Sequence, residues 1–316
     1  MGQTVSGPSI PDAESRALRD LFSALRSKSN QLRPTRTSLP NQSNYPPFND
    51  GKDSWTGITV EMGHVVSIEL PNSHLIGELP AAIGQLTYLR VLNLSSNDIR
   101  GRIPASLGKL RRLAILDLSC NHLGGPLPVE ITSCGHLQHL SLQQNALSGA
   151  LPRNLGQLTQ LRTLSLEYNS FSGPLPVSAT QLLLLERLNV RSNCFSGTIP
   201  NDMGNLTQLK FLSLRNNALE GAIPSSLGNC LHLTFLNLSS NQLSGTVPQS
   251  LTQLTALRHL YVFGNSVDFG QSLPPSIRPI LQRQEVEYLK QVQGRHARVP
   301  TALLVASGSP STSTAS

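Results

Sequence analysis

The sequence has few aromatic and few charged residues. Phe, Trp and Tyr make up 4% of the 316 residues, and Asp, Glu, Lys and Arg make up 14%. Long apolar runs are missing too, because the longest, Leu182–Leu185 and Ala302–Ala306, are far shorter than the roughly 18 residues of a membrane-spanning helix. The composition therefore predicts a chain that does not cross a membrane as a helix.

Cysteine is scarce as well. Four cysteines in 316 residues are too few for a small disulfide scaffold. The first 25 residues contain no apolar segment like the core of a secretory signal. These two shortages together favour a cytoplasmic protein.

The net charge of +7 raises the question of nucleic-acid binding. A nucleic-acid platform gathers its Lys and Arg residues on one face or in one stripe. Here the two signs are nearly balanced through the middle of the chain, and the small positive excess is spread over its whole length. The sequence therefore predicts no nucleic-acid partner.

Leucine, by contrast, is abundant, and it recurs with a fixed period. It fills 55 positions, and an asparagine returns every 24 residues for eight units without an insertion. The recurring asparagines are Asn97, Asn121, Asn145, Asn169, Asn193, Asn217, Asn241 and Asn265. A glycine and a proline keep the same step, from Gly77 to Gly245 and from Pro80 to Pro248. Such a period indicates stacked units that share one continuous core.

One unit, LRVLNLSSNDIRGRIPASLG, begins at Leu89 and shows what each position does. The alternation around Leu92 predicts a short strand with one buried face. Asn97 comes where the strand ends, and we expect its side chain to bond backbone groups of its own turn and of the next unit. Gly101 permits the tight bend that follows, and Pro104 fixes φ on the return path.

The pattern LxxLxxLxLxxNxLxGxIPxxLGxL resembles the plant-type leucine-rich repeat, which occurs in the ectodomains of plant receptor kinases and in secreted inhibitors of the plant cell wall. The resemblance covers residues 63–265. It implies an α/β leucine-rich repeat solenoid, a right-handed coil of 24-residue repeats with a curved parallel β-sheet of about nine strands and a helical cap at each end. It is specific for the fold and does not name a partner.

The family usually begins with a helical cap and a C-x-W-x-G-V-x-C segment. In this chain Ala13–Lys28 has the apolar spacing of an amphipathic helix, and Trp55 and Gly57 match the segment that follows. Asp53 and Val60 stand where the family has its two cysteines. The resemblance therefore implies a cap without the extracellular disulfide, as in a cytosolic relative.

The domain boundaries follow from these patterns. They are a flexible N-terminus at 1–12, an N-terminal cap of a helix and an irregular connector at 13–62, the repeats at 63–265, a C-terminal helical cap at 266–293 and a disordered tail at 294–316.

The cysteines fall on separate units of the repeat. Cys134 and Cys230 are four units apart, and Cys120 and Cys194 are three units apart. A disulfide needs Cα atoms within about 7 Å, so we expect four free thiols and no zinc site.

Function in such a solenoid is expected on the concave face, where residues between the buried leucines point outward. The residues that we select as the partner-binding site are Arg187, Arg191, Phe211, Arg215, Phe235, His259, Tyr261 and Phe263. Glu167 extends the column of Arg191 and Arg215 towards the N-terminus, and Tyr168 adds a further ring. Arginine among exposed rings is typical of interface hot spots and suits a peptide with acidic groups or a free carboxylate. The phenylalanines also suit a strand's outer position through stacking alone, and this second interpretation stays open.

We therefore predict a monomeric, non-enzymatic scaffold in intracellular signalling that binds a protein or peptide. The sequence shows no catalytic constellation and no cofactor motif, and His136 with His139 lacks a third metal ligand. Two alternatives remain. One is a secreted or cell-surface module, receptor-like or inhibitor-like, whose leader is missing, and the other is a regulatory subunit of a kinase or GTPase.

The N-terminus carries a separate signal. Met1 to Ser6, MGQTVS, fits the pattern for N-myristoylation at Gly2. One myristoyl chain binds membranes only marginally, and the nearby cations that could assist it are Arg26, Lys28, Arg33 and Arg36. The cytoplasmic location that we expect therefore extends to the inner face of the plasma membrane.

Overall fold

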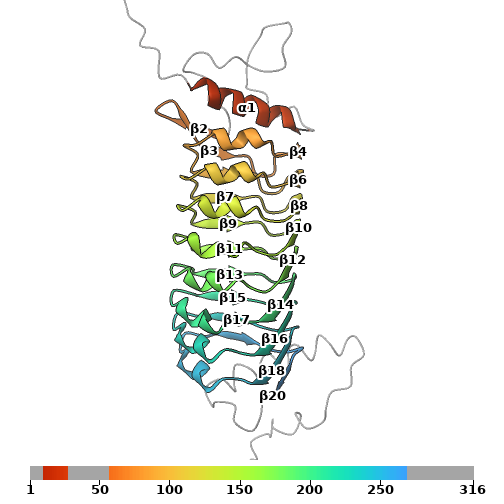
Figure 1. Ribbon diagram of the computed structural model, residues 1–316, viewed down its shortest axis with the longest axis vertical. Helices are drawn as coiled ribbons and strands as arrows, with labels where there is room; N and C mark the ends of the chain where they lie inside the picture. The colour runs from red at the N-terminus through yellow and green to blue at the C-terminus, as the bar shows by residue number, and fades with distance from the viewer. Residues whose placement is uncertain (1–9, 28–56, 269–316) are drawn as a thin grey trace, which may run out of the picture.

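The computed structural model describes residues 10–27 and 57–268 of the chain. Within these ranges the chain winds into a column of stacked coils with an α-helix lying across its N-terminal end (Figure 1). Two ten-stranded sheets run along the column, and a short 3-10 helix completes most coils. The fold is therefore the solenoid that the repeat predicts.

The first sheet is built from the leucine-rich strand of each coil. Its parallel strands are β3 (His64–Glu69), β5 (Val91–Asn93), β7 (Ile115–Asp117), β9 (His139–Ser141), β11 (Thr163–Ser165), β13 (Arg187–Asn189), β15 (Phe211–Ser213), β17 (Phe235–Asn237) and β19 (His259–Tyr261). An antiparallel strand, β2 (Ile58–Glu61), pairs with β3 at the edge. Equivalent residues pair directly between coils, as Leu188 does with Leu212. The nine parallel strands confirm the predicted number.

A second sheet, which the sequence did not predict, runs down another side of the column (Figure 1). Its strands are β4 (Leu75–Glu78), β6 (Asp98–Arg102), β8 (His122–Gly125), β10 (Ala146–Gly149), β12 (Ser170–Gly173), β14 (Cys194–Thr198), β16 (Ala218–Ala222), β18 (Gln242–Thr246) and β20 (Ser266–Asp268). Strands β6 to β18 each contain the repeat glycine, with φ between 73° and 79°. Only a glycine adopts this conformation freely, so the predicted bend lies inside a strand.

Short 3-10 helices follow the repeat prolines. They are η2 (Ala81–Gln85), η3 (Ala105–Lys109), η4 (Val129–Ser133), η5 (Leu155–Gln157), η6 (Val177–Gln181), η7 (Asn201–Asn205), η8 (Ser225–Asn229) and η9 (Gln249–Gln253). In a typical one, the Pro128 carbonyl accepts a hydrogen bond of 3.1 Å from the Ile131 N–H. Proline suits this first position because its φ is already fixed and it needs no N–H partner there.

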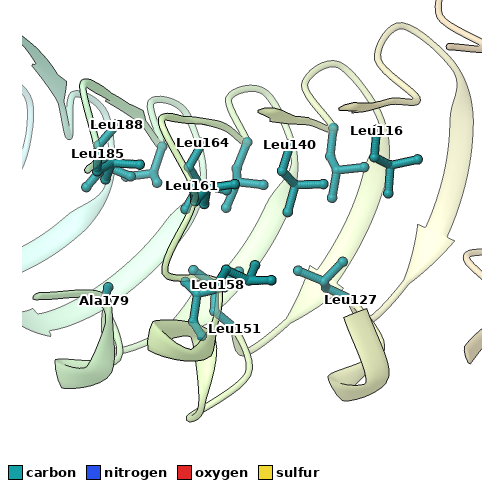
Figure 2. Close-up of a cluster of buried hydrophobic side chains, with 14 of the residues drawn as sticks. Leu116, Leu127, Leu140, Leu151, Leu158, Leu161, Leu164, Ala179, Leu185 and Leu188 are labelled. Carbon is teal, nitrogen blue, oxygen red and sulfur yellow. The ribbon is translucent and has the colours of Figure 1, made fainter. Parts of the chain in front are cut away.

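Leucine fills the interior of the column. Leucines from the first sheet, such as Leu140 and Leu164, face those from the return segments, such as Leu127 and Leu158 (Figure 2). All four side chains are buried, and burying one leucine contributes about 1.5–3 kcal/mol. Because each coil presents the same positions, the interior is continuous from the first coil to the last.

The recurring asparagines form a buried ladder that joins the coils. In the coil of Asn193, Nδ2 donates to the carbonyls of Leu166 and Val190, and Oδ1 accepts a bond of 3.0 Å from the Phe171 N–H. The other repeat asparagines from Asn97 to Asn265 make the equivalent bonds. The neighbouring coil in these bonds is the preceding one, whereas we had expected the next.

The N-terminal helix α1 (Asp12–Ala24) is shorter than the predicted Ala13–Lys28. At Leu25 the chain turns extended, and β1 (Leu25–Ser27) pairs antiparallel with β4 at the edge of the second sheet. The helix ends there because the next three residues pair with β4, Leu25 with Gly77 and Ser27 with Leu75, and this pairing requires an extended backbone.

A buried carboxylate fixes the helix on the first coil. Glu14 accepts a bond of 2.7 Å from His64 Nδ1 on one oxygen and a bond of 2.8 Å from the Val65 N–H on the other. The His64 ring stacks on Tyr88 at 3.5 Å between centroids. Nothing in the local sequence around Glu14 indicates this contact, because its partners lie about fifty residues away.

The array extends slightly beyond its predicted end. Residues 266–268 form β20, a strand of the second sheet, although we had assigned them to the C-terminal helical cap. At the other end, Asp12 already begins the helix within the predicted flexible N-terminus. The rest of the predicted C-terminal cap, the tail, the connector with Trp55, and Gly2 lie outside the described residues.

All four cysteines are free, and two of them are deeply placed. Burial raises the pKa of the Cys134 and Cys230 thiols to about 11. Cys194 is exposed, and Cys120 is half-buried with its thiol bonded to Gln144 Oε1.

Native-state labelling should therefore separate the thiols into two classes. With a maleimide at neutral pH, we expect Cys194 to react first and Cys120 next. Cys134 and Cys230 should react about a hundredfold more slowly or only after unfolding, because each pKa unit lowers the thiolate fraction tenfold. Mass spectrometry of labelled peptides assigns the sites, and Cys194→Ser should remove the fast phase. Four equally fast thiols in the native protein would contradict this packing.

Candidate functional site

The outward positions of the first sheet stack in columns. In β15, Leu212 enters the core and Phe211 lies on the opposite side, which we call the front face. Because the strands pair in register, Phe211 lies beside Phe235, and Phe235 lies beside His259. Side chains that are 24 residues apart in the sequence are thus neighbours on this face.

Aromatic side chains make a continuous row over the last coils. The rings of Phe211 and Phe235 stack with centroids 4.4 Å apart and planes only 6° from parallel. Phe235 is 5.8 Å from His259 and 5.7 Å from Tyr261, and these two rings are 6.4 Å apart. We call these four residues the aromatic ladder. Phe211, Phe235 and Tyr261 are half-buried and His259 is exposed, so the ladder forms part of the protein surface.

Arginines border the ladder on its N-terminal side. The Arg187 guanidinium carbon lies 3.8 Å from the centroid of Phe211, which continues the row by a cation–π contact. The Arg191 guanidinium lies 5.1 Å from the ring of Tyr168 on the preceding coil. Arg215 occupies the position equivalent to Arg191 on the next coil and is also half-buried. The three arginines put concentrated positive charge next to the rings.

Two further cations on the flank are already paired. Glu186 accepts bonds of 2.7 Å from Lys210 Nζ and 2.9 Å from Arg162 Nη1. These hydrogen bonds, from Lys210 first and Arg162 second, lower the pKa of the Glu186 carboxyl. Lys210 and Arg162 are therefore engaged within the protein.

Glu167 is the acidic neighbour of these arginines. Burial raises the pKa of its carboxyl, while an Asn189 hydrogen bond and the charges of Arg187 and Arg191 act in the opposite direction. Its side chain lies in the column of Arg191 and Arg215, one coil before Arg191. The front face thus passes from a carboxylate to arginines to rings along the column.

Seven of the eight residues selected from the sequence lie together on the front face. Phe263 is the exception, because its side chain is only 7% exposed. It meets Tyr261 edge-on, with centroids 6.3 Å apart, and so supports that ring where we had expected it to face a partner. The 24-residue period correctly places Phe263 in the column of Arg191 and Arg215. It does not predict how buried the side chain is, because burial at the end of the array depends on the particular neighbours there.

Tyr168 was not among the selected residues, yet it is 44% exposed on the front face beside Arg191. Its backbone has a φ of 56°, in the left-handed region that large side chains rarely adopt. Equivalent positions on other coils hold Ser96, Gln144, Ser192 and Asn216, with similar φ values. Tyr168 is thus an aromatic residue at a repeat position where these other coils have small or polar residues, and this difference could have been seen in the sequence.

Two other kinds of feature, a metal-binding cluster and a membrane-spanning helix, are missing from the described residues. No three His, Cys, Asp or Glu side chains within residues 10–27 and 57–268 are grouped to hold a metal ion. In the same ranges no helix has both the length and the apolar character needed to cross a bilayer.

Comparison with known families matches most of the described array. A model of the leucine-rich repeat region matches residues 64–172, and two leucine-rich repeat models match residues 184–206 and 212–267. Together these matches cover more than half of the chain.

Solved structures of plant receptors share the fold. A plant peptide hormone receptor, RGFR1, solved with RGF2, is 36% identical with a TM-score of 0.63, over 63% of this chain and 32% of that chain. The ectodomain of the Arabidopsis receptor kinase HAESA, solved with an extended IDA peptide hormone, is 30% identical with a TM-score of 0.69, over 84% and 43%. PEPR1, solved with AtPEP1, is 31% identical with a TM-score of 0.64, over 81% and 42%. This chain therefore spans less than half the length of each.

Proposed function

The chain belongs to the plant-type leucine-rich repeat proteins, and from this premise we propose that it is a non-enzymatic module that binds an extended peptide on its front face. The peptide segment is free or part of a partner protein. It lies across the coils, with apolar side chains on the aromatic ladder and a carboxylate at Arg191 and Arg215.

The observation that carries this proposal is the aromatic ladder with its bordering arginines. Phe211 and Phe235 leave ring surface in contact with water on a face where most other outward residues are small or polar. Covering apolar ring surface is favourable, and aromatic residues and arginine dominate the binding energy of protein interfaces. The two phenylalanine rings do stack on each other, as the interpretation of stacking alone expects. The same stacking holds the rings in fixed positions, which lowers the entropy lost when a partner binds.

The related structures support a peptide as the partner. RGFR1 is a plant peptide hormone receptor solved with RGF2, and the HAESA ectodomain was solved with an IDA peptide hormone. An extended peptide suits a surface that is long along the column axis and repeats at the spacing of strands. Arginine pairs with carboxylate by two parallel hydrogen bonds, which gives the site direction as well as charge.

We place the module in signalling within a reducing compartment. Its support is in the sequence, where Asp53 and Val60 stand at the positions of the cap cysteines that extracellular members of the family have. The alternative is a secreted or cell-surface recognition module, and the likeness to receptor ectodomains favours it. Myristoylation at Gly2 and attachment to the inner plasma membrane remain predictions from the sequence.

A peptide selection tests the proposed function. A random peptide library displayed on phage is selected on immobilised wild-type protein, and affinities of enriched peptides are measured by titration. Phe235→Ala with Arg215→Ala should weaken binding about a hundredfold, because it removes one ring and one cation from the centre of the site. Thermal unfolding should change little, since both side chains are half-exposed.

The matched control changes the same number of side chains away from the front face. Leu231 and Arg153 are exposed on the segments that carry the 3-10 helices, and replacing both by alanine should leave binding unchanged. Equal binding by wild type and the Phe235/Arg215 variant would show that the partner site lies elsewhere.

A further inference from the structure

One column of the front face contains an unusual group of buried polar atoms. Among the described residues, four side-chain nitrogen or oxygen atoms are buried without a hydrogen-bond partner. Three of them are Gln143 Oε1, Glu167 Oε2 and Arg191 Nε, which occupy equivalent positions on three successive coils. The fourth, Ser106 Oγ, lies on η3. Since buried polar atoms in proteins are nearly always paired, three in one column set this part of the face apart.

The order of these atoms defines a chemical preference. Gln143 and Glu167 present two acceptors, one of them on a carboxylate, so they match a positively charged donor such as an ammonium or guanidinium group. Arg191 Nε is a donor and matches an acceptor. The acceptors come first along the column and the arginines follow, with Arg215 on the coil where the aromatic ladder begins.

We propose that the peptide bound on the front face carries a basic group seated between Gln143 and Glu167, and that its acidic group lies between this basic group and its apolar side chains. This inference rests on the proposed function and specifies the ligand of that same site. It adds a cation subsite, upstream of the arginines, that the selected residues did not include.

Tyr168 supplies an independent reason for a cation at this place. Its ring is exposed, and it is the residue next to Glu167 in the chain. The face of a tyrosine ring attracts a cation, and the Arg191 guanidinium of the next coil already lies 5.1 Å from the centre of this ring. A ligand cation between Gln143 and Glu167 would therefore meet two acceptors and a ring.

The buried atoms belong to side chains that a ligand can reach. Gln143, Glu167 and Arg191 are all half-exposed residues whose polar ends turn by rotation about single bonds. A ligand donor placed between Gln143 and Glu167 would pair with both acceptors once their ends turn towards it. The site is thus built from flexible side-chain ends on the segments that directly follow β9, β11 and β13.

The spacing of the coils sets the expected ligand sequence. The cation subsite lies midway between β9 and β11, and the centre of Arg191 and Arg215 lies two coils further on, which is about 10 Å at the strand spacing. An extended peptide covers that distance in about three residues. The peptide should therefore show a basic residue, an acidic residue about three positions away, and aromatic or aliphatic residues beyond the acidic one.

The same phage selection, repeated on two single variants, tests this order. On the wild type, enriched peptides should carry a basic residue with an acidic residue between it and the apolar ones. On Glu167→Gln, which keeps the size of the side chain, the basic residue should lose its enrichment while the acidic and apolar residues keep theirs. Glu130→Gln, an exposed carboxylate on η4, is the matched control and should give the wild-type pattern.

A charge cycle with one enriched peptide gives the second readout. Replacing the peptide's basic residue by glutamine should weaken binding to the wild type about tenfold and leave binding to Glu167→Gln almost unchanged. Retained enrichment of basic residues on Glu167→Gln, or an equal loss for both proteins, would overturn the cation subsite alone. Selection of no peptide by the wild type would overturn the proposed function and this inference together.

Discussion

Replacing Asn193 by alanine should lower the free energy of unfolding by roughly 4 kcal/mol, because two or three buried backbone groups lose their partner at about 1–3 kcal/mol each. The side chain bonds the carbonyls of Leu166 and Val190 and the N–H of Phe171, and it is only 9% exposed. Alanine reaches none of these groups, and water has little access to them. Chemical denaturation followed by circular dichroism measures the change.

The control uses another asparagine of the same region. Asn205 lies at the end of η7 with its side chain exposed, so Asn205→Ala should change the free energy of unfolding by less than about 0.5 kcal/mol. Similar losses for the two variants would mean that the ladder contributes no more than a surface amide. The comparison isolates the buried hydrogen bonds because both changes remove the same chemical group.

The asparagine ladder also matters for the front face. Each ladder asparagine ties its own coil to the preceding one, and this fixes the spacing at which Phe211, Phe235 and His259 follow one another. Rings at a fixed spacing need no ordering when a partner binds, which favours affinity. Stability and recognition therefore depend on the same repeated contacts.

The period allowed the repeat core and the columns of the front face to be predicted. Leu140 and Leu164 are buried, as their place in the repeat required, and Phe211 and Phe235 are neighbours because a separation of 24 residues equals one coil. Periodicity fixes which residues share a column, since every coil repeats one path. It needs no knowledge of side-chain contacts.

Features that depend on contacts between coils could not be predicted in this way. The second sheet was not predicted because a strand such as Asp98–Arg102 buries only Ile99 and contains a glycine. Its sequence therefore lacks the alternation of apolar and polar residues that indicates a strand. The end of α1 and the contacts of Glu14 depend on partners far away in the sequence. The unpaired atoms of Gln143 and Glu167 depend on side-chain conformations that no pattern of residue types describes.

Replacing Gly204 by alanine should lower the free energy of unfolding by about 3 kcal/mol, the upper part of the usual range for overpacking. A Cβ atom at Gly204 would overlap the carbonyl oxygen of Ser226 on the next coil and come within 2.8 Å of the Ser226 Cβ. Both atoms belong to Ser226 in η8, and neither can move away by a rotation of a side chain, because the carbonyl oxygen and the Cβ atom are fixed by the backbone. Thermal and chemical unfolding measure the loss.

Gly135→Ala is the matched control, because a Cβ atom there meets nothing within 4 Å. That change should be neutral or stabilise the protein by about 0.5 kcal/mol, because alanine lowers the conformational entropy of the unfolded chain.

The Gly204 substitution should also affect binding. The coil that contains Gly204 leads into Phe211, and the coil that contains Ser226 leads into Phe235, so an added Cβ atom between η7 and η8 should move these two rings apart. Gly204→Ala should therefore bind the enriched peptides more weakly than Gly135→Ala does, even at temperatures where both are folded. Equal stability of the two variants would mean that the close approach of η7 and η8 does not set the spacing of the coils.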